Sequence, residues 1–358
     1  MIGIARAGAT RDPAWGDATL DAAATDPLLQ RFIIYLHTRR PLGPREIDRF
    51  IVALERGASP EHLSALMFGG VTAAIPAEDL SRLLRRLIAH PDGVAAASQI
   101  LQMRFFGDKQ KERDYAPELV EVARLILIDP RSYDTQRRRS DRELSQLAKI
   151  VLRTEQGAAT AVAIARHLRG LKRVEAMDEF DDLGRALLDA FPRIVLDELV
   201  LGTTVRARRR GLLDLLLGGV LGDRDGSGED KRPSIDVDLI RSWVAEDPQT
   251  RATRLAELIP YTSSLDAGGL AWSDAARALI DLAPDPLPIL AAFEDRFFSG
   301  VSSGPFSGRY VRRLPMVASL KDHFDPRVRH WAREAEVRLH RSIEHWDTFD
   351  REDGSRFE

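Results

Sequence analysis

Apolar residues recur along almost the whole chain at the spacing of one helix face, and this periodicity limits the fold more than any single motif. In the segment from Ala77 to His90 the apolar stripe consists of Leu80, Leu83, Leu84, Leu87 and Ile88. Similar patterns cover residues 27–40, 44–56, 92–105, 117–128, 142–153, 157–169, 178–201, 205–221, 235–245, 248–259, 271–283 and 287–298. Alternating β-branched runs and Asn-Gly hairpin turns are missing. The sequence therefore predicts an all-α fold.

Asp-Pro pairs stand at or near many of these segments. An Asp side chain can accept hydrogen bonds from the free N–H groups of a helix start, and Pro suits the first helical position. The pairs begin at Asp26, Asp129, Asp247, Asp285 and Asp325. The last three are 38 and 40 residues apart, close to the length of a HEAT or armadillo unit. We therefore expect an α-solenoid of HEAT-like antiparallel helix pairs, although Asp-Pro is also a common helix start in a chain rich in both residues.

A polar stretch without apolar residues interrupts the helical pattern at residues 223–234, and we expect a linker or loop there. It would separate an N-terminal helical-repeat block, residues 27–222, from a C-terminal HEAT-like block, residues 235–347. Chain ends are commonly poorly ordered, so residues 1–26 are expected to be a flexible segment and residues 348–358 a disordered tail.

The composition excludes several classes of site. The chain has no cysteine, which excludes disulfides, thiolate zinc sites, iron–sulfur clusters and a cysteine nucleophile. Its net charge of −3 does not suit a nucleic acid or an anionic membrane. Only six of the 52 basic residues are lysine, a bias typical of high-GC bacterial genomes. The N-terminal residues lack the apolar core of a signal peptide, and we expect a soluble, cytoplasmic protein.

Two Gly-containing stretches resemble catalytic or binding motifs. GVSSG, residues 300–304, matches a serine-hydrolase nucleophile elbow around Ser302, but a helical segment stands where this elbow needs a strand. The loop from Asp223 has Ser234 where a calcium loop needs Glu, and no Gly precedes Lys231 as a phosphate-binding loop requires. We interpret both as loops and predict no catalytic residue and no cofactor; a hydrolase acting through Ser302 is an alternative that Ser302→Ala would test.

Histidines are concentrated between Leu320 and Phe349. The four positions, His323, His330, His340 and His345, do not form the i, i+4 pair that places two imidazoles on one helix face for a metal. The apolar or small residues of the segment form a helical stripe that consists of Val328, Trp331, Ala332, Ala335, Leu339 and Trp346. We therefore predict the last helix of the stack rather than a metal site. The sequence around His90 is a looser copy of that around His323.

Three arginine clusters are the candidate contacts for a partner or for phosphate groups. They contain Arg137, Arg138 and Arg139; Arg206, Arg208, Arg209 and Arg210; and Arg309, Arg312 and Arg313. A helical-repeat surface lined by arginines can bind phosphates, so nucleic-acid binding is an alternative function. In a chain with this much arginine, clusters also arise by chance and pair with nearby Asp and Glu, and the negative net charge favours that interpretation.

The segment DHFDPRVRHWAREAE, residues 322–336, resembles the second helix of a HEAT repeat. The resemblance rests on Asp325, the pair Val328-Arg329, and the small residues Ala332 and Ala335. More broadly, the blocks HPDGVAAASQILQMRFFGDK and LAPDPLPILAAFEDRF are similar to helical-repeat regions of bacterial STAND-type and anti-phage defence proteins. Such regions serve in recognition or assembly beside an ATPase or effector, and neither of those signatures is present in this chain. The resemblance implies a non-catalytic protein-binding or scaffold module in antiviral defence.

Overall fold

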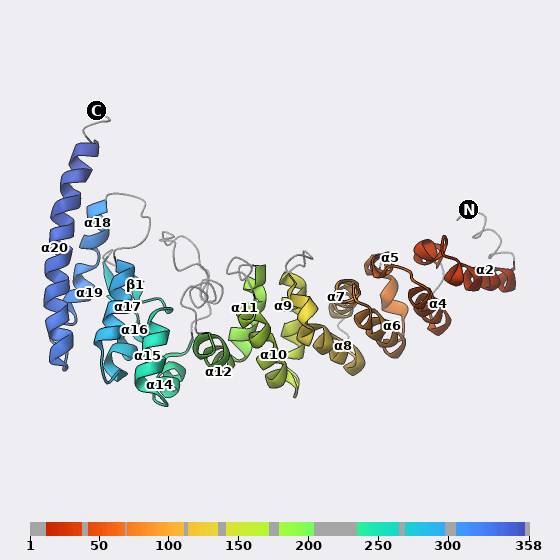
Figure 1. The fold of residues 1–358 in the computed structure, drawn as a ribbon, viewed down its shortest axis with the longest axis horizontal. Helices are drawn as coiled ribbons and strands as arrows, with labels where there is room; N and C mark the ends of the chain where they lie inside the picture. Colours follow the sequence, from red (N-terminus) through yellow and green to blue (C-terminus); the bar gives the residue numbers. More distant parts are fainter. Residues whose placement is uncertain are drawn as a thin grey trace. The chain divides into compact units, whose positions relative to one another are not determined.

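The computed structural model describes residues 12–37, 42–68, 70–110, 114–134, 141–171, 179–203, 235–264, 269–297 and 306–354. Apart from one short hairpin, the regular elements of these residues are helical, which confirms the predicted helical class (Figure 1). The chain divides into two compact units: unit 1 is Met1–Leu171 with Asp182–Ala190, and unit 2 is Lys172–Asp181 with Phe191–Glu358.

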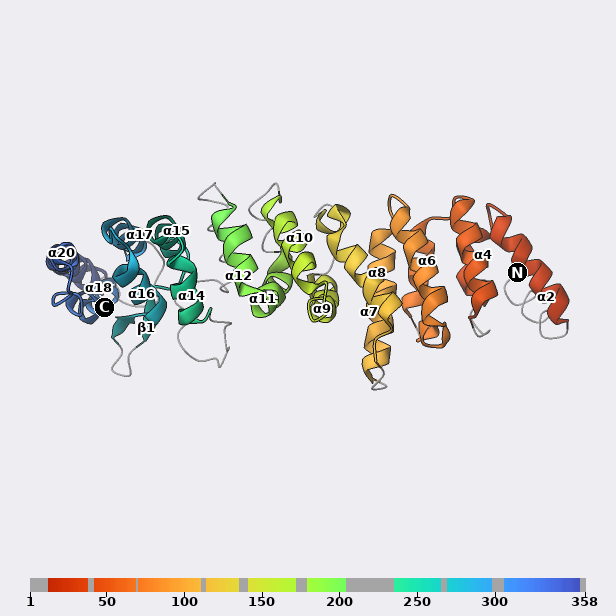
Figure 2. The same cartoon turned by 90° about the horizontal axis from the view of Figure 1, so that it is seen from below.

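Unit 1 consists of helices and short helical turns. They are α2 (Pro13–Thr25), η1 (Gln30–Phe32), α3 (Ile33–His37), α4 (Pro44–Glu55), α5 (Pro60–Leu63), η2 (Ser64–Met67), η3 (Val71–Ala74), α6 (Ala77–Ala89), α7 (Val94–Gln110), α8 (Pro117–Ile128), η4 (Pro130–Tyr133), α9 (Asp141–Val151), α10 (Gly157–Arg169) and α11 (Asp181–Ala190). Helices α2, α4, α6 and α8 pack one against the next and form what we call the α2–α8 layer (Figures 1 and 2). Helix α7 packs on α6, α8 and α9 and on the turns η2 and η3.

The predicted apolar stripes form the core of unit 1. In α6, the side chains of Leu80, Leu83, Leu84 and Leu87 are completely buried. Burial of a leucine side chain contributes about 1.5–3 kcal/mol relative to exposure, so a stripe of four holds the helix firmly against its neighbours. The arginines and Glu78 of α6 are exposed, as the amphipathic pattern requires, whereas Ser81 is buried.

The N-terminal segment differs from the prediction, because residues 13–25 form helix α2 rather than a flexible arm. A sixth Asp-Pro pair starts it: Asp12 Oδ1 accepts hydrogen bonds from the N–H groups of Ala14 and Trp15 at 3.0 and 3.2 Å. The helix buries Leu20, together with two alanines, and packs on α4. Its buried face is mostly alanine, which gives a weak apolar signal in the sequence.

The five predicted Asp-Pro pairs all cap a turn or helix start. In each pair an aspartate Oδ1 accepts a backbone N–H: Asp26 from Leu28 (2.7 Å), Asp129 from Arg131 (2.8 Å), Asp247 from Thr250 (3.2 Å), Asp285 from Leu287 (3.2 Å) and Asp325 from Arg327 (2.8 Å). These N–H groups have no partner inside the helix, so the caps stabilise the starts that the sequence predicted.

Unit 2 also consists mainly of helices. Its elements are α12 (Pro192–Val195), the π-helix η7 (Leu196–Leu201), α14 (Val237–Val244), α15 (Pro248–Ala256), β1 (Thr262–Ser264), β2 (Leu270–Trp272), α16 (Asp274–Leu282), α17 (Leu287–Phe297), α18 (Phe306–Val311), α19 (Leu314–Ala318) and α20 (Pro326–Gly354). Helix α14 packs on α15 and α16, and α15 packs on α16 and α17. The predicted helix at 205–221 and the predicted linker at 223–234 lie outside the described residues.

A small hairpin in unit 2 was not expected from the sequence. Strands β1 and β2 are antiparallel, with Thr262 opposite Trp272 and Ser264 opposite Leu270. Tertiary contacts hold it: the Trp272 Nε1–H donates to the carbonyl of Met316 at 2.8 Å, and the Leu270 N–H donates to the carbonyl of Arg312 at 2.8 Å. Strands of three residues leave too short an alternation to be recognised in sequence.

Along the chain, the division between the two compact units falls at residues 172–191. The predicted helix at 178–201 is broken at Phe191, because Pro192 disfavours the helical conformation of the residue before it. The residues that follow belong to unit 2: the Trp243 Nε1–H donates to Asp197 Oδ1 at 2.8 Å, and Arg254 hydrogen bonds to the carbonyl of Leu201.

The C-terminal helix is longer than predicted. Helix α20 continues through residues 348–354, which were expected to be disordered, and it ends at Gly354. No Gly or Pro occurs between Pro326 and Gly354, so nothing in this stretch breaks the helix earlier. The predicted stripe is confirmed at Val328, Ala332 and Leu339, which are buried.

Candidate functional site

Seven of the ten candidate arginines lie outside the described residues: Arg137, Arg138, Arg139, Arg206, Arg208, Arg209 and Arg210. The third cluster lies around the end of α18. Arg313 is only 8% exposed and its Nη1 donates to the carbonyl of Arg309, while the Arg309 guanidinium lies 5.9 Å from the centre of the Tyr310 ring. Arg312 is exposed. This cluster does not form an outward row of three cations, and nucleic-acid binding through the other two clusters stays a prediction.

Several arginines outside these clusters bind the carbonyl ends of helices. Arg131 donates to the carbonyls of Ile88, in the last turn of α6, and His90, just beyond it, at 2.6 and 2.9 Å. Arg296 donates to the carbonyls of Ile259 and Ala256 at 2.9 and 3.1 Å. The last carbonyls of a helix have no intrahelical donor and attract positive charge. These arginines therefore stabilise the fold.

The α2–α8 layer carries ion pairs between successive helices. Arg49 of α4, whose side chain is 4% exposed, donates to Asp17 and Asp21 of α2 at 3.1 and 2.7 Å. The hydrogen bond from Arg49 is the main cause that lowers the pKa of Asp21 below its usual value. Arg82 of α6 pairs in the same way with Asp48 of α4. Most charged side chains of this layer thus form ion pairs with other residues of the protein.

The other side of unit 1 exposes large apolar side chains. Among the described residues of unit 1, six of the seven exposed large apolar residues lie off the α2–α8 layer: Leu28, Phe32, Tyr35, Phe68, Met103 and Phe106. The first three follow helical spacing across η1 and α3. Met103 and Phe106 share one face of α7, and Phe68 follows η2, which packs on α7. We call these residues the apolar face of unit 1.

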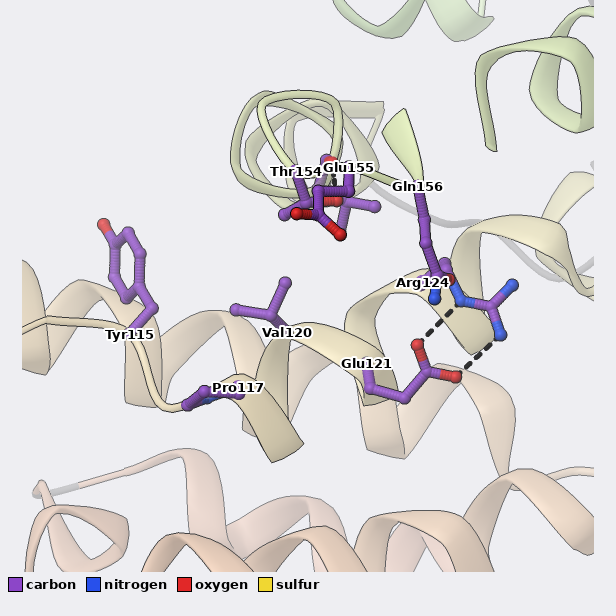
Figure 3. Close-up of a pocket in the computed structure, with 9 residues that line it drawn as sticks. Tyr115, Pro117, Val120, Glu121, Arg124, Thr154, Glu155 and Gln156 are labelled. Atoms are coloured by element: carbon purple, nitrogen blue, oxygen red, sulfur yellow. Dashed lines mark hydrogen bonds and ion pairs between the residues drawn. The ribbon is translucent and has the colours of Figure 1, made fainter. Parts of the chain in front are cut away.

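Unit 1 also holds a pocket of about 390 Å³ between the start of α8 and the turn that joins α9 to α10, which we call the α8 pocket (Figure 3). Its apolar lining comes from Pro117, Val120 and Val151, with the Tyr115 ring at one side. The turn supplies Glu155, whose carboxylate is directed toward Val120 in Figure 3.

The remaining charged groups of the α8 pocket neutralise each other. Arg124 donates from Nε and Nη2 to the two carboxylate oxygens of Glu121, at 2.7 and 2.6 Å (Figure 3). This contact is the main cause that lowers the pKa of Glu121, and the charge of Arg85 adds to it. Glu155 forms no ion pair with any residue that the structure describes. The pocket was not predicted, because it joins two turns far apart in sequence and neither has a recognisable motif.

The histidine-rich segment of the C-terminus is confirmed as a packed helix and its preceding turn. His323 is buried: its Nε2 lies 2.7 Å from Asp281 Oδ1, and its Nδ1 accepts the N–H of Asp325 at 3.0 Å. His90 Nδ1 likewise accepts the N–H of Asp92, so the looser sequence copy has the same local bond. Ser302 lies outside the described residues. Within the described ranges, no group of three or more His, Asp and Glu side chains is arranged to hold a metal.

No helix in the described part of the chain is both long enough and apolar enough to cross a membrane. Comparisons with protein-family models, curated proteins and solved structures found no match to this chain.

Proposed function

We propose that the protein is a non-catalytic recognition or scaffold module, built as a HEAT-like α-solenoid, and that it binds another protein. The helix order supports the solenoid, because α2, α4, α6 and α8 follow one another in one layer. Hydrogen bonds from arginine side chains to backbone carbonyls support it too. The sequence separation between the arginine and the carbonyl residue is 37 to 43 positions, about one repeat length, for Arg131, Arg296 and Arg327.

The observation that carries the proposal is the difference between the two sides of unit 1. In the α2–α8 layer, charged side chains form ion pairs with one another, whereas the apolar face exposes Phe32, Met103 and Phe106. Phe106 is 53% exposed, in a helix that is otherwise well packed. Grouped exposed aromatic and Met side chains are typical of protein-binding surfaces, and aromatic residues often dominate their binding energy.

The test is affinity capture from the native host with three forms of the tagged full-length protein. The wild type is expected to recover a protein at a fixed ratio. Phe106→Glu should lower that recovery at least ~10-fold, because a buried charge replaces an aromatic anchor. Val337→Glu is the matched control, since Val337 is an exposed apolar residue on α20. Equal recovery by Phe106→Glu, or recovery of nucleic acid alone, would contradict the proposal.

The resemblance to helical-repeat regions of STAND-type and anti-phage defence proteins extends the proposal to the class of partner. It suggests a separate ATPase or effector subunit. Mass spectrometry of the captured protein would identify an ATPase or effector, and deletion of the gene should lower resistance to phage. A partner of unrelated class, with unchanged phage resistance, would remove the defence role and leave the binding function.

A further inference from the structure

The charge distribution of the α8 pocket identifies the kind of group it can receive. Arg124 and Glu121 form a two-bond pair, so their charges cancel and neither is free for a ligand. Glu155 remains without an ion pair among the described residues, and its carboxylate is directed over the apolar lining (Figure 3). Among the described residues, the pocket thus combines an apolar surface with one negative charge that has no ion pair.

We propose that the α8 pocket binds a lysine or arginine side chain of the partner protein. The methylene stem of such a side chain would lie along Pro117, Val120 and Val151, while its cationic end reaches Glu155. The Tyr115 ring offers a second contact for the cation through its electron-rich face. The assignment rests on the proposed function, because the side chain belongs to the protein that the module recognises.

Other ligand classes fit the pocket less well. An anion would meet the unpaired Glu155, and the cation of Arg124 is already held by Glu121. A purely apolar side chain would form no ion pair with Glu155, which is exposed to solvent. A divalent metal ion would find a single free carboxylate, too few ligands for a protein site.

The experiment uses the full chain with methyl-labelled residues and capped tripeptides Gly-X-Gly as probes. X is lysine, arginine, norleucine or glutamate, so norleucine keeps the stem and lacks the charge. The lysine and arginine probes should shift the methyl signals of Val120, Val151 and Thr154 saturably. They should bind about fivefold more tightly than the norleucine probe, as expected for one partly exposed ion pair. Added salt should reduce this preference.

Two variants decide whether Glu155 is the group responsible. Glu155→Gln should remove the preference for lysine over norleucine, whereas Glu118→Gln, an exposed residue of α8 outside the pocket lining, should leave it unchanged. Absence of shifts with all four probes, equal binding of lysine and norleucine, or tighter binding of glutamate would overturn the assignment. The titration contains no partner protein, so its failure is distinguishable from failure of the capture experiment with Phe106→Glu.

Discussion

Arg131 donates a hydrogen bond from Nη2 to the carbonyl oxygen of Ile88 at 2.6 Å, and the two residues are 43 positions apart. Arg131 is also held by the cap residue Asp129, so one side chain joins the end of α6 to the turn η4. Arg327 and the carbonyl of Pro284 have the same separation and a distance of 2.9 Å. The Asp-Pro-Arg sequence therefore does more than start a turn or helix, because its arginine also binds a carbonyl at or just beyond the end of an earlier helix.

Replacement of Arg131 by Gln should lower the free energy of unfolding by about 2 kcal/mol. The change removes charge-assisted hydrogen bonds to the Ile88 and His90 carbonyls and leaves them without these donors. Arg153→Gln is the control, because Arg153 is an exposed residue of the α9–α10 turn. Urea unfolding followed by circular dichroism measures both. Equal effects of the two substitutions would show that the carbonyl contacts contribute little.

Arg49→Ala should destabilise the attachment of α2 to α4 by roughly 3 kcal/mol. The nearly buried guanidinium holds Asp17 and Asp21 of α2, and its loss leaves these carboxylates close together without their main counter-charge. Hydrogen exchange should increase in residues 13–25 more than in α6. Arg45→Ala should have a smaller effect, since Arg45 is exposed and makes its pairs in solvent. Unchanged exchange in α2 would contradict this account.

Gly93→Ala should be strongly destabilising, by about 3 kcal/mol, because an added Cβ would lie 1.8 Å from the carbonyl oxygen of Leu87. Gly107→Ala is the opposite case, inside helix α7, which Gly93 precedes. A Cβ at Gly107 meets no atom within 4 Å, and Ala is the better helix former by up to about 1 kcal/mol. Thermal unfolding should therefore shift down for the first variant and slightly up for the second. A tolerated Gly93→Ala would show that the turn before α7 can rearrange.

Features that depend on neighbouring residues could be predicted from the sequence, and those that depend on distant contacts could not. The stripe of α6 and the cap at Asp325 are set within one or two helical turns, so periodicity and the Asp-Pro pair were sufficient. The partner of Arg131 is fixed by the packing of η4 beyond the end of α6. No pattern near Arg131 identifies Ile88.

The candidate site was missed for a similar reason. Apolar and polar residues are mixed around helix α7 without one dominant apolar side, so the sequence does not show that Met103 and Phe106 face outward rather than into the core. The α8 pocket depends on the approach of Tyr115 and Glu155, which come from separate turns. The arginine clusters, in contrast, were conspicuous in sequence. The described cluster nevertheless places Arg313 almost out of contact with solvent.

The cap of α20 should give a measurable dependence of stability on pH. Arg327, mainly through its side-chain hydrogen bonds, lowers the pKa of Asp325 from 3.8 to about 2. Because the folded state favours the ionised carboxylate, its stabilisation is complete above pH 3.8 and is lost as the pH falls toward 2. Carboxyl NMR titration of Asp325 should therefore show a midpoint near 2 in the wild type and closer to 3.8 in Arg327→Gln. Arg329→Gln should leave the midpoint low, since Arg329 binds the carbonyls of His323 and Phe324 instead. A wild-type midpoint near 4 would mean that the Asp325–Arg327 pair does not persist in solution.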